Sequence, residues 1–193
     1  AILVILAFPL GLYIGKVMNG EKTMLSPVFL PFEKAVYKII KVKADEEMSW
    51  KKYLSCTFLF SAAGLVFLTA LQMLQAYLPG NPQRLPNVPW DLSFNTAASF
   101  VTNTNWQAYT GEATLSYLTQ SLGLTVQNFV SAATGIAVLF ALIRAFNKVK
   151  SKVIGNFWVD MTRILIHLLI PLNFVIAISS TQVHAYTTTT GQS

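Results

Sequence analysis

Residues 91–107 read Asp91-Leu92-Ser93-Phe94-Asn95-Thr96-Ala97-Ala98-Ser99-Phe100-Val101-Thr102-Asn103-Thr104-Asn105-Trp106-Gln107. The first eleven residues have the composition of a helix, and Asp91, which follows Pro89 and Trp90, is suited to be its N-cap. At about 1.5 Å per residue, a helix over 91–101 spans only about half of a bilayer core. We therefore expect a re-entrant pore helix over 91–101, followed by a polar filter loop over 102–110.

The composition around this segment is typical of a membrane protein. Of the 193 residues, 53% are hydrophobic and only 11% are charged, whereas soluble domains carry about a quarter charged residues. Residues 53–83, 113–143 and 164–193 contain no Asp, Glu, Lys or Arg, and about 20 apolar residues are enough to cross a bilayer. We expect an all-α polytopic membrane protein with transmembrane helices over about 1–17, 51–77, 123–146 and 157–180.

The basic residues indicate the orientation of these helices. Eight of the 14 lie between Lys16 and Lys52, five lie between Arg144 and Arg163, and only Arg84 lies elsewhere. This pattern follows the positive-inside rule, which makes 18–50 a cytoplasmic loop and 181–193 an external loop. We interpret the net charge of +6 as a determinant of topology, and we expect no nucleic acid as a partner.

One part of the cytoplasmic loop is amphipathic. Within residues 32–42, Phe32, Val36, Ile39 and Ile40 share one side, and lysines occupy another. Such a helix is expected to lie on the surface of the lipid bilayer.

The expected loop after the short helix offers neutral oxygen ligands. Carbonyl, hydroxyl and amide oxygens of Thr and Asn can replace the water shell of a monovalent cation, and Thr102–Thr110 contains no carboxylate. The C-terminus of the preceding helix carries about half a negative charge, which also favours a cation. The alternative is a polar, solvated connection between two helices.

Further polar residues lie near or within the expected spans. Gln127 and Asn128 either line the vestibule of a pore or bridge two helices. Glu112, the acid that follows the loop, either orders the loop or attracts cations at its mouth. We interpret His167 as a hydrogen-bond partner between helices rather than as a proton relay.

Catalytic motifs are absent from the sequence. It has no Walker-type glycine loop, no paired carboxylates, no convincing Ser/His/Asp set and no Asp-Lys-Thr-Gly of an ion-pumping ATPase. Asp160 and Arg163 are expected to form a local ion pair, and the single cysteine, Cys56, is interpreted as a small apolar helix residue. We therefore expect a non-hydrolytic chain whose energy source lies on another subunit.

The segment over 90–146 closely resembles the KdpA family, the potassium-binding, channel-like subunits of bacterial ATP-driven potassium uptake systems. The resemblance rests on 94–109 and on Gly123-Leu124-Thr125-Val126-Gln127-Asn128-Phe129 and Ala141-Leu142-Ile143-Arg144-Ala145-Phe146. It implies the fold of the potassium transporter superfamily, with four helix–pore-loop–helix units around one pore. The chain begins inside an apolar run without Met, so we expect it to be truncated at its start. Because members of the family are much longer, the resemblance implies an N-terminal portion that holds the first unit and flanking helices.

The resemblance also implies roles for single residues. Asn103 and Thr104 would offer filter carbonyls to a potassium ion, while Thr102, Asn105 and Gln107 would shape or flank the filter. Unlike simple potassium channels, the sequence has no Thr-Val-Gly-Tyr-Gly, and the core of its loop has no glycine. Some other feature must therefore set the geometry of the carbonyls.

The function implied is binding of extracellular potassium and its delivery across the bacterial plasma (inner) membrane within a high-affinity, ATP-driven complex. The implied partners are KdpB, a P-type subunit that hydrolyses ATP, then KdpC and a small helical subunit; potassium is the transported ligand, with no organic cofactor. An alternative is a secondary transporter of potassium or another solute driven by an ion gradient, which would favour a titratable residue near the midplane, such as His167. A membrane-embedded enzyme would need a convergent catalytic set.

Overall fold

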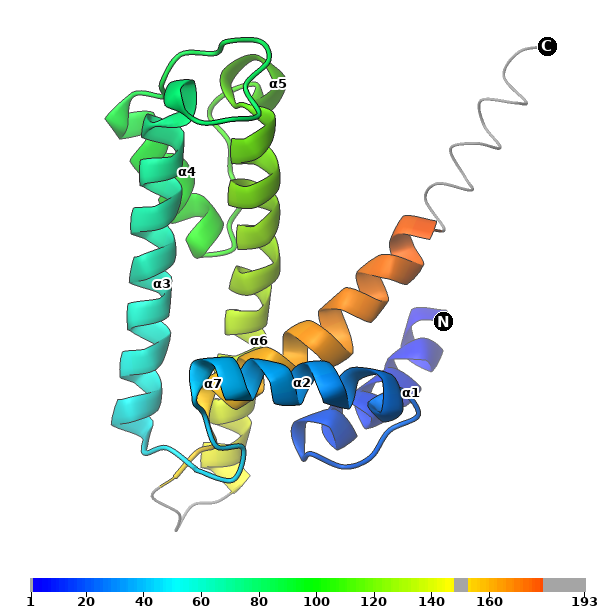
Figure 1. Cartoon of the computed structure of the whole chain (residues 1–193). Coiled ribbons are helices and arrows are strands. Elements are labelled where there is room, and N and C mark those ends of the chain that lie inside the picture. The colour runs from blue at the N-terminus through cyan, green and yellow to red at the C-terminus, as the bar shows by residue number, and fades with distance from the viewer. Residues whose placement is uncertain (1, 148–152, 179–193) are drawn as a thin grey trace, which may run out of the picture. The chain divides into compact units, whose positions relative to one another are not determined.

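The computed structural model describes residues 2–147 and 153–178, and within these ranges every regular element is a helix (Figure 1). The prediction of an all-α chain is confirmed. The described residues belong to two compact units, one from 2–45 and 158–178 and the other from 46–147 and 153–157, and each unit is considered by itself. The external loop expected over 181–193 lies outside the described residues.

Three helices are long and apolar enough to cross a membrane: Trp50–Met73, Thr119–Asn147 and Phe157–Ile178. The first ends at Met73, four residues before the expected boundary, and a short turn, η1 (Gln75–Tyr77), follows it. The second begins earlier than the expected residue 123, because the Ser116 hydroxyl accepts the backbone N–H of Thr119 at 3.2 Å. A side-chain oxygen in this position caps the start of a helix.

The central unit is built from α3 (Trp50–Met73), α4 (Trp90–Val101), α5 (Gly111–Thr114), η2 (Thr119–Thr125) and α6 (Val126–Asn147). Figure 1 shows the short helix α4 between α3 and α6, after which the chain turns back toward α5. Ala97 and Phe100 of α4 are buried with Leu68 and Leu71 of α3 in one apolar cluster. Burial of this face fixes α4 against α3.

The start of α4 differs from the prediction. The helix begins at Trp90, with Pro89 in the cap position, so Asp91 lies in the first turn. The prediction that Asp91 is the N-cap was wrong by two positions. In the first turn its carboxylate still lies near the positive end of the helix dipole.

Gln75 joins the segments on both sides of α4. Its buried Nε2 donates to the carbonyls of Pro86 at 2.7 Å and Thr114 at 2.8 Å. Its Oε1 accepts the backbone N–H of Ser116 at 3.0 Å and the hydroxyl of Thr119 at 3.2 Å. Because a buried amide is costly unless it is hydrogen-bonded, these four contacts hold the chain before and after α4 in one arrangement.

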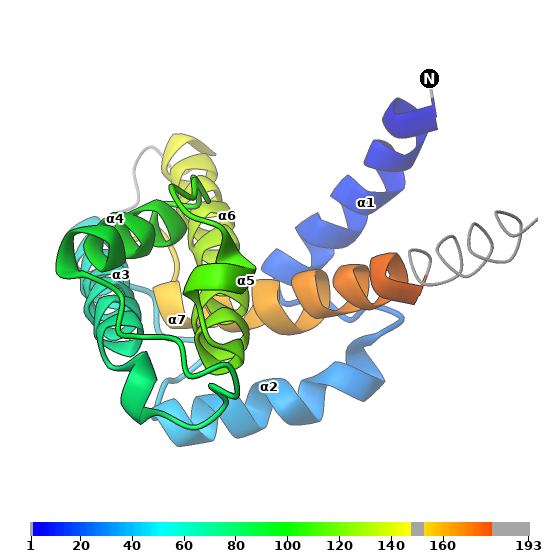
Figure 2. The ribbon, with the colours of Figure 1, turned by 90° about the horizontal axis from the view of Figure 1, so that it is seen from above.

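The other unit contains α1 (Ile2–Met18), α2 (Ser26–Ile40) and the helix from α7 (Phe157–Arg163) through η3 (Ile164–Leu169), which is π-helical. Gly20, with φ of 74°, ends α1: its N–H donates to Val17, and the N–H of Glu21 donates to Lys16. This pair of bonds is a Schellman motif. The turn leads into α2, which packs against η3 (Figure 2). Of the helix expected over 157–180, residues 179 and 180 lie outside the described residues.

Candidate functional site

Ser99, in the last turn of α4, folds the polar loop back onto the end of the helix. Its carbonyl accepts the backbone N–H of Thr104 at 2.9 Å and that of Asn105 at 3.2 Å. Its hydroxyl accepts the backbone N–H of Trp106 at 2.6 Å. One buried residue therefore binds three successive amides of the loop, a role that the sequence pattern did not indicate.

These bonds determine where the loop carbonyls point. In a planar trans peptide the C=O lies opposite to the N–H. Because the N–H groups of residues 104–106 point toward Ser99, the carbonyls of Asn103, Thr104 and Asn105 point away from the end of α4. Three consecutive carbonyl dipoles are thus presented on the open side of the loop.

Two asparagines in the loop adopt a left-handed backbone conformation that is usually occupied by glycine. Asn103 and Asn105 have φ of 59° and 57°, in the left-handed region that most L-residues avoid. Asparagine tolerates this region better than other non-glycine residues do. The backbone of the loop core is therefore left-handed at the residues on either side of Thr104, although the core contains no glycine. These two asparagines set the geometry of the loop carbonyls.

Side chains fix the loop at two further points. The Thr102 hydroxyl donates to the carbonyl of Ala98 at 2.9 Å and lies 3.0 Å from the hydroxyl of Thr104. The Asn103 side-chain oxygen accepts the Ser131 hydroxyl of α6 at 3.2 Å. The loop is therefore held both by the helix before it and by α6.

The surface of the loop is polar, uncharged and exposed. Residues 102–107 are all exposed in this chain, and Gln107 donates through Nε2 to the Tyr109 hydroxyl at 3.4 Å. Among the described residues, no group of three or more His, Cys, Asp or Glu side chains is arranged to hold a metal ion. The ligands that the loop offers are neutral oxygens, which suit a weakly hydrated monovalent cation better than a divalent one.

The other residues considered for pore lining occupy different places. Glu112 lies exposed on α5. Gln127 is buried on α6 and lies against Gly64 of α3: its Oε1 is 3.1 Å from the position that a Cβ at Gly64 would take. This contact favours the interpretation that Gln127 bridges two helices. Asn128 is exposed, one residue further along α6.

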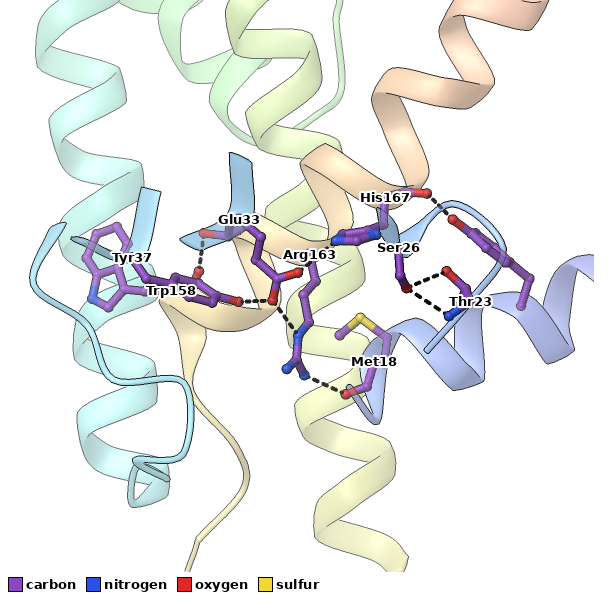
Figure 3. A network of polar contacts seen from close by, with 10 residues as sticks. Met18, Thr23, Ser26, Glu33, Tyr37, Trp158, Arg163 and His167 are labelled. Carbon is purple, nitrogen blue, oxygen red and sulfur yellow. Dashed lines mark hydrogen bonds and ion pairs between the residues drawn. The ribbon is translucent and has the colours of Figure 1, made fainter. Parts of the chain in front are cut away.

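A second polar cluster lies in the other unit, where Glu33 of α2 contacts one residue of α7 and one of η3 (Figure 3). Its Oε1 lies 3.2 Å from Nε of Arg163, and its Oε2 lies 2.7 Å from Nε2 of His167. Arg163 also donates to the carbonyl of Met18 at the end of α1, at 3.3 Å. Arg163 therefore contacts Glu33, and His167 bridges two helices as expected, whereas the local ion pair of Asp160 with Arg163 stays a prediction.

The carboxyl of Glu33 is stabilised in its charged form. Burial raises its pKa, but hydrogen bonds from Tyr37, His167 and Arg163 outweigh burial and leave the pKa below its ordinary value of 4.5. Burial and the hydrogen bond to Glu33 raise the pKa of the Tyr37 hydroxyl. The sequence pattern missed Glu33; the available signal was its position as the only acid between Lys22 and Lys43, four residues before Tyr37.

The chain is similar to one family along almost its whole length. The family described as KdpA, Potassium-transporting ATPase A subunit, matches residues 1–191. Proteins named potassium-transporting ATPase potassium-binding subunit are 60% identical over 177 residues in Clostridium perfringens, 57% over 178 in Clostridium botulinum and 55% over 181 in Pseudomonas syringae pv. tomato. Each alignment covers 92% of this chain but only 30%, 31% and 32% of the respective relative. The chain thus spans about a third of the length of these curated relatives.

Proposed function

Because the chain belongs to the KdpA family of potassium-transporting ATPase A subunits, we propose that its loop over Thr102–Gln107 forms one part of a potassium-selective filter. With its three long apolar helices, the chain is part of a multi-pass membrane protein, and the relatives that identify it are bacterial. Potassium binding is what the names of those relatives state, and the loop is the segment of this chain whose chemistry suits that ion.

The single observation that carries the proposal is the arrangement around Ser99. Its contacts with three amides leave the carbonyls of Asn103, Thr104 and Asn105 turned outward together. Carbonyl dipoles can replace the hydration shell of potassium at little energetic cost. The end of α4, which lies behind the loop and carries a partial negative charge, adds a longer-range attraction for a cation. Asn103 and Thr104 are proposed as the direct ligands, with Thr102, Asn105 and Gln107 shaping or flanking them.

A single loop cannot surround an ion. The remaining ligands would come from a part of the full-length protein that corresponds to the region of the longer relatives outside the alignment with this chain. Extracellular potassium would enter the assembled filter and pass through the membrane, and Glu112 near the mouth would attract cations. Asn128 remains a proposed pore-lining residue, and for Gln127 a bridging role between α3 and α6 is proposed.

The energy for uptake would come from partner subunits. The relatives are named as the potassium-binding subunit of a potassium-transporting ATPase, and this sequence has no Asp-Lys-Thr-Gly motif. We assign ATP hydrolysis to a separate P-type subunit, KdpB, with KdpC and a small helical subunit in the same complex. Transport driven by an ion gradient would favour a titratable residue near the midplane of the membrane, and His167 is the candidate. The contact of His167 with Glu33 at 2.7 Å supports a role as a hydrogen-bond partner between helices instead.

The proposal is tested by the ion selectivity of the full-length complex reconstituted in vesicles. ATP-driven uptake of potassium is measured in the presence of sodium, for wild-type protein and for Ser99→Ala. If the loop is part of the filter, the variant discriminates less well between the two ions. Unchanged selectivity in a folded variant would mean that the loop is a solvated connection.

A further inference from the structure

Helix α2 is oriented with its one acidic residue inward and an apolar ridge outward. Ser26, Glu33 and Tyr37 form its buried face, and Tyr37 donates to Glu33 at 2.7 Å. Figure 3 shows Glu33 directed toward Arg163 and His167. A surface helix of a soluble protein normally buries its apolar stripe and exposes its charges. Helix α2 departs from this rule in two ways, because it buries its one acidic residue and exposes an apolar ridge, while Lys34 and Lys38 remain exposed.

The outward ridge consists of Val28, Phe32 and Ile39, which are 59%, 61% and 77% exposed. Their spacing of four and seven residues places them on one side of the helix. Met24, just before the helix, is 92% exposed. This ridge was only partly anticipated, because Val36, which was expected on the same side, is half-buried.

The exposed charges of α2 itself are both positive. Between residues 22 and 44 the only acid is Glu33, which is buried and paired with Arg163. The five lysines of this segment are all exposed: Lys22, Lys34, Lys38, Lys41 and Lys43. Lys34 and Lys38 are four residues apart and therefore share one side of α2. The segment thus combines an apolar ridge with a basic flank.

We propose that this outward face of α2 binds anionic phospholipids. These lipids would belong to the membrane leaflet in which the C-terminal end of α1 lies. The ridge of Val28, Phe32 and Ile39 would enter the boundary between headgroups and acyl chains, and the lysines would contact lipid phosphates. The position fits, because only seven residues separate the end of the apolar helix α1 at Met18 from the start of α2 at Ser26. This function is independent of the proposed filter.

Glu33 is the positioning residue for this face. Its contacts with Arg163 and His167 hold the inward side of α2 against η3, and a helix has only one orientation in which that side is inward. The ridge is therefore presented away from the unit to which α2 belongs. A face held in this way can select lipids by charge without being reordered on binding.

The test uses p-benzoylphenylalanine, a photoreactive amino acid close to Phe in shape, in place of Phe32. The full-length complex is placed in vesicles of equal parts phosphatidylcholine and phosphatidylglycerol and is irradiated, and the adducts are identified by mass spectrometry. We expect phosphatidylglycerol adducts in excess over phosphatidylcholine adducts. The same amino acid in place of Tyr37, on the inward face, should give cross-links within the chain.

Charge is tested with the double substitution Lys34→Gln and Lys38→Gln in the same background. A surface lysine contributes about fivefold to the binding of anionic lipid, so removing two lysines should lower the preference for phosphatidylglycerol by about 25-fold. Cross-links from position 32 to another protein segment would overturn the proposal, because the ridge would then be a protein interface. Lipid adducts without a headgroup preference would overturn it as well, as would the absence of any lipid adduct both from Phe32 and from a second variant with the photoreactive residue in place of Ile39.

Discussion

The hydroxyl of Ser99 accepts the backbone N–H of Trp106 at 2.6 Å, seven residues further along the chain. Together with the two amides bound by the Ser99 carbonyl, this contact turns a run of polar residues into a loop of defined shape. The geometry of the proposed filter in this unit therefore depends on a small buried residue that is not itself a proposed ligand.

Replacing Ser99 by Ala should weaken potassium binding. The backbone N–H of Trp106, an exposed residue, loses a hydrogen bond worth about 0.5–1.5 kcal/mol, so the apparent KM for potassium uptake should rise by about two- to tenfold. Ser93→Ala is the matched control: Ser93 is also buried on α4, but its hydroxyl donates to Val88, away from the loop. An equal KM for both variants would contradict the role of Ser99.

Replacing Gln107 by Arg should reduce uptake most strongly at low external potassium. Gln107 is exposed beside the loop, and a fixed positive charge there would repel the approaching ion. At an effective dielectric constant near 20 and a separation of roughly 8 Å, the repulsion corresponds to a rise in apparent KM of about tenfold or more. Gln107→Met, which adds no charge, should change KM much less. An unchanged KM for the Arg variant would count against the loop assignment.

Asn105 should accept glycine but not valine. At its φ of 57° a β-branched residue is strained by about 1–3 kcal/mol, whereas glycine is not. We expect Asn105→Gly to keep an apparent KM for potassium within about twofold of wild type, and Asn105→Val to raise it about tenfold. Potassium uptake by the reconstituted full-length complex provides the measurement, and equal behaviour of the two variants would argue against the left-handed geometry.

Acid should loosen the unit that contains α2. The pKa of Glu33 lies below its ordinary value of 4.5, so its contribution to stability is present above pH 4.5 and is lost as the pH falls through the lower folded-state pKa. Thermal unfolding of the full-length complex should show this loss, and the Glu33→Gln variant should show a weaker dependence in the same acidic range. A dependence identical to wild type would exclude Glu33 as its source.

Gly20→Ala should destabilise the same unit. At φ of 74° an alanine is strained by about 1 kcal/mol, and its Cβ would lie 2.8 Å from Nη2 of Arg163. The midpoint of thermal unfolding should therefore fall. Gly15→Ala provides the control, because a Cβ at Gly15 meets nothing within 4 Å and alanine favours the helix. A similar fall in both variants would remove the special role of Gly20.

Much of the fold follows from local patterns in the sequence. The lengths of the apolar stretches predicted the long helices, and the half-length segment after Pro89 predicted a short helix that ends at Val101, as α4 does. The uncharged composition of Thr102–Gln107 indicated the ligand chemistry of the loop. These properties depend on neighbouring residues, so hydropathy and helix periodicity are sufficient to reveal them.

Contacts between distant residues could not be found in this way. Glu33 and His167 are 134 residues apart, and nothing in either local pattern indicates that they meet. The inward face of α2 depends on that pairing. Similarly, the early start of the helix at Thr119 depends on Gln75, which holds Ser116 and Thr119 from 41 and 44 residues away.

By itself, the sequence determined an all-α membrane chain, its short helix and a neutral polar loop, because hydropathy and side-chain chemistry are properties of local segments. Only the tertiary structure decided that Ser99 turns the loop carbonyls outward and that Glu33 turns the apolar ridge of α2 away from its unit. The physical reason is the same in both cases. Hydrogen bonds are directional, so a polar side chain reveals which face it orients only when its partner is in place.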